Sequence, residues 1–237
     1  MALALIIGAG PVVGKATAET FTAAGYKVAV AARTQRLDPS YPFFQFDATE
    51  PTQVPAFFQK VREAVGIPSV VVYNAYGSGS SIRGPGFDID SIEAFQARMN
   101  ANGITPTIVA KEAVDGFLEL ESQGKLAAGG GTFLLTGNIL NETPLPGFFS
   151  LGLGKSTSAA LIKYLALTSY NDKPFSFYYV DERHADGSPM YQGTTGPAHA
   201  KEFLKLAQDP KQGPWQHTFS KENGYEVFTD AWLSKAK

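Results

Sequence analysis

Hydrophobic residues gather in short, uninterrupted runs that alternate with longer stretches of helical periodicity as far as residue 180. The runs predict six strands, at Leu3–Ile7, Lys27–Ala32, Phe43–Phe46, Val70–Tyr73, Thr132–Leu135 and Phe175–Val180. Because the runs are largely apolar throughout rather than at alternate positions, both faces of each strand are expected to be buried. That pattern is typical of a parallel sheet.

Apolar positions spaced three and four residues apart predict helices between these runs. The helices are expected at Val12–Ala24, Val54–Val65, Asp88–Ala101, Thr107–Gln123, Lys155–Ser169 and Ala198–Ala207. Strands and helices in alternation predict an α/β fold of the Rossmann type, a doubly wound parallel sheet in three layers with helices on both faces. No repeat or linker interrupts the chain, so residues 1–237 are expected to form a single domain.

Composition and charge exclude several kinds of site. Lys and Arg number 20 against 22 Asp and Glu, a net charge of -2, so the chain lacks the basic field that attracts nucleic acid. It has no cysteine, which excludes disulfides, thiolate metal sites and a cysteine nucleophile. The histidines, His184, His199 and His217, lack the spacing of metal ligands, and no metal site is expected.

The amino terminus is apolar as far as Ile7, where Gly8 ends the run. It lacks the positive start of a signal peptide and predicts a buried strand instead. No stretch approaches the roughly 18 apolar residues of a membrane span. The expectation is therefore a cytoplasmic protein without a membrane segment.

A glycine-rich turn, Gly8-Ala9-Gly10-Pro11-Val12-Val13-Gly14, joins the first strand to the first helix. Backbone in this context can turn tightly and approach a pyrophosphate, and the helix N-terminus offers aligned N–H groups to the negative charge. The candidate phosphate-binding residues are Gly8, Gly10, Val12, Val13 and Gly14. The alternative is a tight turn with no ligand.

The end of the second strand bears on which dinucleotide binds. NAD-binding folds usually carry an acid there for the ribose 2′-OH, but this chain has Ala32 followed by Arg33. A guanidinium suits a 2′-phosphate, so NADP(H) is the expected cofactor. Lys15 can add positive charge but can equally be a solvated helix residue, and the alternative for Arg33 is a surface arginine. Residues 1–237 are thus expected to be one NAD(P)-binding domain, with 181–237 as the substrate loop and C-terminal segment.

Several spaced motifs together resemble the short-chain dehydrogenase/reductase family. They are Gly8-x-Gly10-x-x-x-Gly14, Asp47, Asn74-Ala75-Tyr76-Gly77, Asn100-Ala101-Asn102-Gly103 and Lys155. The resemblance covers roughly residues 3–180 and is more specific than any one of its motifs. It implies that Asp47 and Ala48 lie at the adenine, that Asn74 and Ala75 pass under the adenosine ribose, that Lys155 holds the nicotinamide ribose, and that Asn100 keeps a water in a proton relay.

The chain departs from the family pattern at the residues that carry the chemistry. Leu151 stands four residues before Lys155, where the family has its catalytic tyrosine, and Asn138 stands where the serine is expected. Val12 replaces the middle glycine of the phosphate turn, and residues 180–183 replace a Pro-Gly turn after the sixth strand. The chain therefore resembles an atypical branch that retains the lysine and lacks the tyrosine and serine.

These departures leave the proton source open. Leu151 has no proton to give, whereas the Asn138 amide can polarise a carbonyl through a hydrogen bond. Other candidate acids are Tyr76, Asp181, Glu182, His184 and Tyr191, each of which also has a simpler structural explanation. Asn100, Asn138 and Lys155 are the candidate catalytic residues.

Two classes of function follow. The first is an NADP(H)-dependent oxidoreductase with an unusual proton source and a small-molecule substrate. The second is a non-catalytic NADP(H)-binding sensor or interaction protein, and a non-redox enzyme also stays open. The helix at Lys155–Ser169 is apolar around most of its circumference, which predicts a homodimer or homotetramer.

Overall fold

The sheet brings the carboxyl ends of its central strands together. The structure is a computed structural model that describes residues 1–77, 86–190 and 193–228, and its eight strands pair in the order β3-β2-β1-β4-β5-β6-β7-β8. The strands are β1 (Leu3–Ile7), β2 (Lys27–Ala32), β3 (Phe43–Gln45), β4 (Val70–Tyr73), β5 (Gly131–Thr136), β6 (Phe175–Arg183), β7 (Gln216–Ser220) and β8 (Gly224–Tyr225). Neighbouring strands are parallel except β7 and β8. β1 lies between β2 and β4, so the winding direction reverses at β1, and open α/β sheets bind ligands at the carboxyl end of such a strand.

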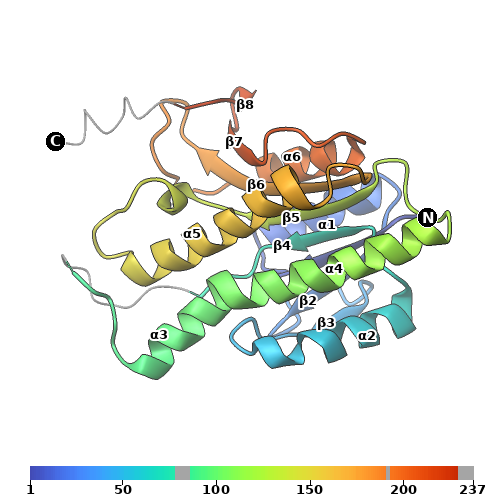
Figure 1. The fold of residues 1–237 in the computed structure, drawn as a ribbon, viewed down its shortest axis with the longest axis horizontal. Helices are drawn as coiled ribbons and strands as arrows, with labels where there is room; N and C mark the ends of the chain where they lie inside the picture. Colours follow the sequence, from blue (N-terminus) through green and yellow to red (C-terminus); the bar gives the residue numbers. More distant parts are fainter. Residues whose placement is uncertain (78–85, 191–192, 229–237) are drawn as a thin grey trace.

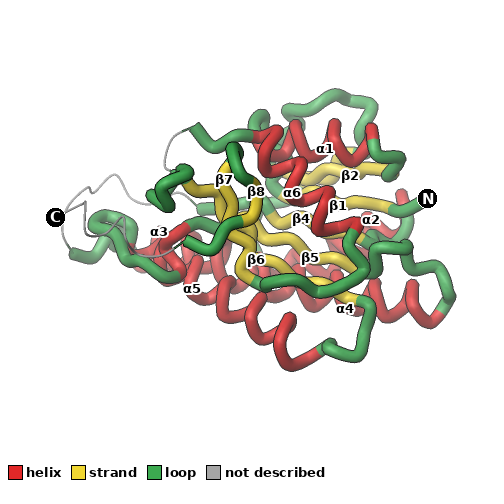
Figure 2. Tube along the Cα trace, turned by 90° about the horizontal axis from the view of Figure 1, so that it is seen from above, coloured by secondary structure: helices red, strands yellow, loops and turns green. Residues whose placement is uncertain are grey.

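Helices cover both faces of this sheet (Figures 1 and 2). α1 (Val13–Ala23) and α6 (Gly196–Gln208) lie on one face. α2 (Val54–Val65), α4 (Thr105–Ser122) and α5 (Phe149–Tyr164) lie on the other. Further segments are α3 (Ile92–Met99), 3₁₀ turns at Pro51–Gln53 and Ile139–Asn141, and π turns at Asn100–Ile104 and Leu165–Ser169. The predicted three-layer, single-domain α/β fold is confirmed.

Each face of the sheet has its own hydrophobic core. In β6, Phe177 and Tyr179 pack into the core under α2, α4 and α5, whereas Tyr178 and Val180 pack into the core under α1 and α6. All four are buried, and each large apolar side chain removed from water contributes about 1.5–3 kcal/mol. Burial on both faces explains why the strands read as uninterrupted hydrophobic runs.

The sheet extends beyond the six predicted strands. β6 continues through Asp181, Glu182 and Arg183, which the sequence analysis places after the strand. Their buried charges are paired: Nε of Arg183 lies 2.5 Å from Oδ2 of Asp181, and Glu182 pairs with His199. Pairing reduces the cost of burying charge in a strand. β7 and β8 form from the segment in which the sequence predicts only an aromatic tail.

Two of the predicted helices form one continuous helical stretch, which contains a proline. The sequence predicts two separate helices at Asp88–Ala101 and Thr107–Gln123, but α3, the π turn and α4 follow one another without a break. Pro106 has no N–H, and its ring would clash in a regular α-helix. The wide π turn just before it accommodates the proline.

α5 begins earlier than predicted, at Phe149 rather than Lys155. The carboxylate of Asp88 accepts a hydrogen bond from the backbone N–H of Ser150 at 2.7 Å and another from its hydroxyl at 2.5 Å. This distant side chain caps the helix, and the local sequence gives no sign of it. None of the described helices is both long and apolar enough to cross a membrane.

Candidate active site

Three glycines form the turn between β1 and α1, and packing within the protein accounts for two of them. Gly8 has a φ of +88°, and a Cβ on it would lie 2.3 Å from the backbone nitrogen of Ala75. A Cβ on Gly14 would lie 2.6 Å from Cα of Ala9. A Cβ on Gly10 would meet, among the described atoms, only the carbonyl oxygen of Gly8 at 4.0 Å. The protein thus leaves space beside Gly10, as the close approach of a pyrophosphate requires.

The start of α1 adds the electrostatic part of this site. N–H groups in the first turn of a helix have no acceptor within the helix, and the helix dipole favours an anion there. Val13 is buried in the core, whereas Val12 is 52% exposed. Val12 can therefore contact a phosphate through its backbone and through its branched side chain.

The end of β2 carries no acidic side chain. Ala32 is its last residue, and the side chains of Arg33 and Arg36 beyond it are exposed. Neither arginine forms an ion pair with a described residue, whereas Lys15 lies 3.8 Å from the carboxylate of Glu19. Arg36 is a second exposed cation at this edge, and it is not among the residues singled out from the sequence.

Asp47 and Ala48 lie in a turn that is tied to the π turn. The Asp47 carboxylate accepts hydrogen bonds from the N–H and hydroxyl of Thr49 at 2.9 and 2.8 Å. Nδ2 of Asn100 donates a hydrogen bond to the carbonyl oxygen of Thr49 at 2.8 Å. The hydroxyl of Thr105 donates another to the carbonyl oxygen of Ala48, also at 2.8 Å. The Asn100 side chain therefore holds this turn, and its contact with a relay water stays a prediction.

A chain of hydrogen bonds joins four elements at the carboxyl edge of the sheet. Nδ2 of Asn74 donates to the carbonyl oxygen of Gly8 at 2.8 Å, and the hydroxyl of Thr136 donates to Oδ1 of Asn74 at 2.9 Å. Nζ of Lys155 donates to the carbonyl oxygen of Thr136 at 2.7 Å. The phosphate turn, the ends of β4 and β5, and α5 are thus held in one arrangement. Thr136, which is not among the residues singled out from the sequence, connects the two halves.

Lys155 is a buried cation at this edge, with 6% of its surface exposed. Burial lowers the pKa of its ammonium to about 8, and the charge of Asp181 opposes that shift. Asp181 follows Val180, the partner of Thr136 in the β5–β6 ladder, and so lies at the same edge. Burial raises the pKa of Asp181 to about 6, while Arg183 acts against the shift. Ionisable groups shifted in this way are typical of functional sites.

Leu151 and Asn138, for which the family resemblance predicts a tyrosine and a serine, have structural contacts of their own. Leu151 packs against Ile139 and Leu140. Oδ1 of Asn138 accepts a 3.0 Å hydrogen bond from the N–H of Leu140 and caps the 3₁₀ turn. The Asn138 backbone also exchanges hydrogen bonds of 3.0 and 2.8 Å with the hydroxyl of Tyr179. This leaves the NH₂ half of the amide as the part that can meet a ligand.

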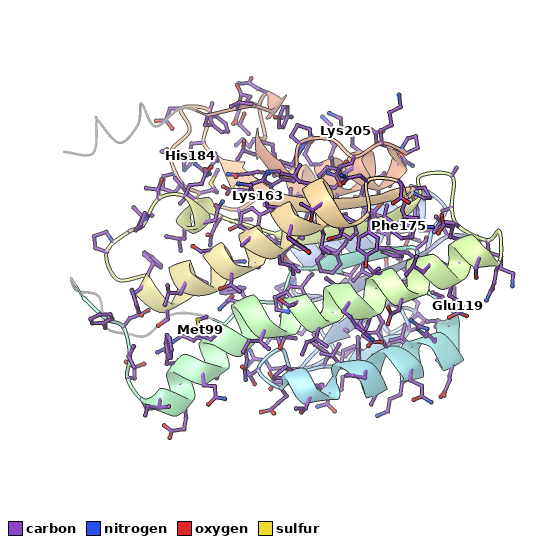
Figure 3. The ribbon with its side chains drawn as sticks, in the orientation of Figure 1. Met99, Glu119, Lys163, Phe175, His184 and Lys205 are labelled. Carbon is purple, nitrogen blue, oxygen red and sulfur yellow. The ribbon has the colours of Figure 1, made fainter. Side chains whose placement is uncertain are left out.

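The alternative proton donors are placed less favourably. Asp181 and Glu182 are buried and paired with cationic or histidine side chains. His184 is exposed at the carboxyl end of β6 (Figure 3), and Tyr76 is 67% exposed. Tyr191 lies outside the described residues. Among the described candidates, only Tyr76 and His184 are exposed.

An apolar cavity of about 470 Å³ lies beside the beginning of α5. Its described lining includes Leu140, Pro144, Leu145, Phe148 and Leu153. Apart from Ser156, every lining residue that is described is apolar or glycine. Leu145, Phe148 and Leu151 all pack against the cluster of Ile139 and Leu140, which places the cavity near the candidate catalytic position.

Comparisons with known proteins give results in keeping with this geometry. The family described as short chain dehydrogenase matches residues 2–128. The short chain dehydrogenase/reductase dmxR12 of Cryptosporiopsis sp. (strain 8999) is 36% identical over 239 residues, which cover 95% of this chain and 94% of that protein.

Solved structures show the same fold at lower identity. A metagenomic short-chain oxidoreductase in complex with NADP aligns with a TM-score of 0.74 at 16% identity, covering 92% of this chain and 96% of its own. NADH-dependent reductase A1-R′ complexed with NAD aligns with a TM-score of 0.73 at 18% identity, covering 87% of this chain and 88% of its own. Structures similar to this chain therefore include complexes with either dinucleotide.

Proposed function

Since the chain belongs to the short-chain dehydrogenase/reductase family, we propose that it is an NADP(H)-dependent oxidoreductase that acts on an apolar carbonyl compound or the matching alcohol. One observation carries the proposal: the open space beside Gly10 is joined through Asn74 and Thr136 to the buried ammonium of Lys155. A phosphate site and a reacting centre would thereby be held at a fixed separation, which is the positioning that hydride transfer needs.

The residues present fit a dinucleotide. The backbone of Gly8–Gly14 would hold the pyrophosphate, Asp47 and Ala48 would meet the adenine, and Asn74 and Ala75 would lie under the adenosine ribose. Arg33 would pair with a 2′-phosphate, which the absent carboxylate at Ala32 would not repel. When bound, the nicotinamide supplies or accepts the hydride.

The chain's own residues would then act on the substrate oxygen. The Lys155 ammonium would hold the nicotinamide ribose and favour negative charge at the reacting centre. The NH₂ group of Asn138 would donate a hydrogen bond to a carbonyl oxygen and polarise it. Leu151 gives no proton, so the proton would come from water. Because general acid catalysis typically supplies a factor of about 10²–10⁴, turnover is expected to be slow.

The cavity beside Leu151 favours an apolar substrate. Its walls offer leucine, proline and phenylalanine side chains, which bind apolar surface and leave a charged group without a partner. We therefore expect aromatic or aliphatic ketones and aldehydes to bind better than charged sugars or organic acids.

A second candidate function rests on Leu151 and Asn138. With neither a tyrosine nor a serine at the positions that match the family motif, the chain can be a sensor that binds NADP(H) without turnover. The difference between the two functions is whether bound NADPH is consumed.

The test combines binding and turnover. Calorimetric titration with NADPH should show saturable binding, and a panel of apolar ketones and aldehydes should cause slow NADPH oxidation matched by alcohol formation. Lys155→Met should abolish this oxidation. Tight binding with no product from any carbonyl would support the sensor instead, and no binding of either dinucleotide would exclude both functions.

A further inference from the structure

The carboxylate of Glu182 is buried at the carboxyl end of β6, on the face that α6 covers. The backbone N–H of Thr195 donates to it at 2.9 Å, and the Thr195 hydroxyl donates to it as well. Nδ1 of His199 lies 3.1 Å from its Oε2. Although burial acts to raise the pKa of Glu182, the neighbouring His199 imidazole and the hydrogen bonds from Thr195 outweigh it and lower that pKa. Glu182 is therefore an anion at neutral pH.

These contacts fix the beginning of α6. Thr195 directly precedes the helix, and His199 lies in its first turn. The imidazole of His199 is buried, with edge-to-face contacts to Phe203 and Phe219. A negative charge at the N-terminus of a helix is also favoured by the helix dipole. Glu182 therefore sets where α6 begins relative to β6.

The beginning of α6 rests in turn on the phosphate turn. A Cβ on Gly196 would lie 2.5 Å from the carbonyl oxygen of Val12 and 3.0 Å from Cβ of Ala16. The backbone of Gly196 packs directly against the backbone of Val12. A shift of Gly196 therefore changes the packing that holds Val12 in place. α1 and α6 lie side by side on the same face of the sheet (Figure 2).

We propose that Glu182 is a positioning residue for dinucleotide binding. By holding Thr195 and His199, it keeps Gly196 against Val12 and so fixes the backbone that receives the pyrophosphate. This role rests on the proposed function. It also gives a reason for a buried charge at a place where the family resemblance implies a Pro-Gly turn.

Glu202 offers a matched control. It is buried on α6 itself, and its Oε2 lies 2.8 Å from Nε2 of His217 on β7. Both glutamates thus pair with a buried histidine, but Glu182 alone of the two holds Thr195, the residue before α6. Replacing either glutamate disturbs the packing of α6. Replacing Glu182 also removes the hydrogen bonds that hold Thr195 at the beginning of α6.

The experiment compares full-length wild type with Glu182→Ala, Glu182→Gln and Glu202→Ala. We expect the NADPH Kd of Glu182→Ala to rise about tenfold, a typical coupling between a distant group and a site. Glu182→Gln keeps an acceptor for Thr195 and should recover part of that loss. The NADPH Kd of Glu202→Ala should stay within about twofold of the wild-type value, even if its Tm falls as much as that of Glu182→Ala.

A second readout needs no cofactor. In the unliganded protein, the backbone amide NMR signals of Gly8, Gly10 and Gly14 should shift in Glu182→Ala and stay in place in Glu202→Ala. Thr195→Val, which removes one hydroxyl, should give a smaller change in the same direction and serves if Glu182→Ala does not fold.

Unmoved glycine signals and an unchanged Kd in folded Glu182→Ala or Thr195→Val would overturn the positioning role. A wild-type protein that binds no NADPH would instead overturn the proposed function, and this role with it. The two failures are therefore distinguishable in one set of measurements.

Discussion

The ammonium of Lys155 donates a 2.7 Å hydrogen bond to the carbonyl oxygen of Thr136. The hydroxyl of the same threonine continues the chain to Asn74 and from there to Gly8. A buried cation costs stability, since water solvates it better than the protein interior does. A cation kept at the carboxyl edge of the sheet in spite of that cost is consistent with a role in binding or chemistry.

Binding of NADPH should weaken as the pH rises through about 8, the pKa of Lys155, because the ammonium loses its charge there. Stability should change in the opposite sense. Burial lowers this pKa from 10.5 to about 8, so the unfolded chain binds more protons between these values, and the free energy of unfolding should rise across that window. Calorimetric titration and chemical denaturation at a series of pH values measure both trends.

Lys155→Met is the control for this pH dependence. It should bind NADPH more weakly at neutral pH and lack both trends, since the titrating group is gone. The same pH dependence of Kd in Lys155→Met and wild type would assign the effect to another group. Unchanged affinity in the variant would show that the motif around Leu151 is misaligned.

The protein should prefer NADPH to NADH. Arg33 and Arg36 are exposed cations at the end of β2, and a charged hydrogen bond to a 2′-phosphate is worth about 1.5–3 kcal/mol, or roughly tenfold or more in Kd. Arg33→Ala should reduce the ratio of the NADH Kd to the NADPH Kd, mainly by weakening the binding of NADPH. Lys125→Ala, which removes an exposed cation after α4, should leave it unchanged. Equal affinity of the wild type for both dinucleotides would refute the preference.

Carbonyl reduction should improve when a hydroxyl pair is restored. In Leu151→Tyr with Asn138→Ser, serine can still cap the 3₁₀ turn, and the tyrosine would stand one helical turn from Lys155. The rate with simple ketones should rise by up to about 10²–10⁴, the usual contribution of a general acid. Leu151→Phe with Asn138→Ser has the same ring without the hydroxyl and should show no gain. Rapid turnover by the wild type would mean that it already has an acid at this site.

We propose that the chain forms a homodimer or homotetramer through α5 and the turn after it. Exposed apolar side chains gather there, with Leu153 at 39%, Tyr164 at 64% and Leu167 at 51% exposure. Ala160 is exposed within this stretch, so Ala160→Arg should dissociate the oligomer, whereas Ala160→Ser should leave it intact. Light scattering at micromolar concentration measures the mass, and a monomeric wild type would contradict the proposal.

Short stretches of sequence were enough to predict the phosphate turn and the position of Lys155. The β1–α1 turn has its glycines where the strand ends, and Lys155 follows from a motif spacing, so both are visible in one stretch of sequence. The burial of Glu182 is not, because its partner His199 comes from another element and meets it only in the folded chain. Asn138 shows a further limit: a capping asparagine and a catalytic one are the same residue in a sequence, and only the contact with Leu140 shows that it caps.

NADPH binding by Gly10→Ala shows whether the turn after β1 receives the pyrophosphate of a dinucleotide. A Cβ on Gly10 has no protein atom nearer than 4.0 Å among those described, and its φ is not positive, so the free energy of unfolding should stay within about 0.5 kcal/mol of wild type. The same methyl group would stand where a phosphate must approach, so the Kd for NADPH should rise by roughly tenfold or more. Gly14→Ala, whose Cβ would lie 2.6 Å from Ala9, should instead lose stability. A folded Gly10→Ala that binds NADPH as tightly as wild type would show that the pyrophosphate does not bind at this turn.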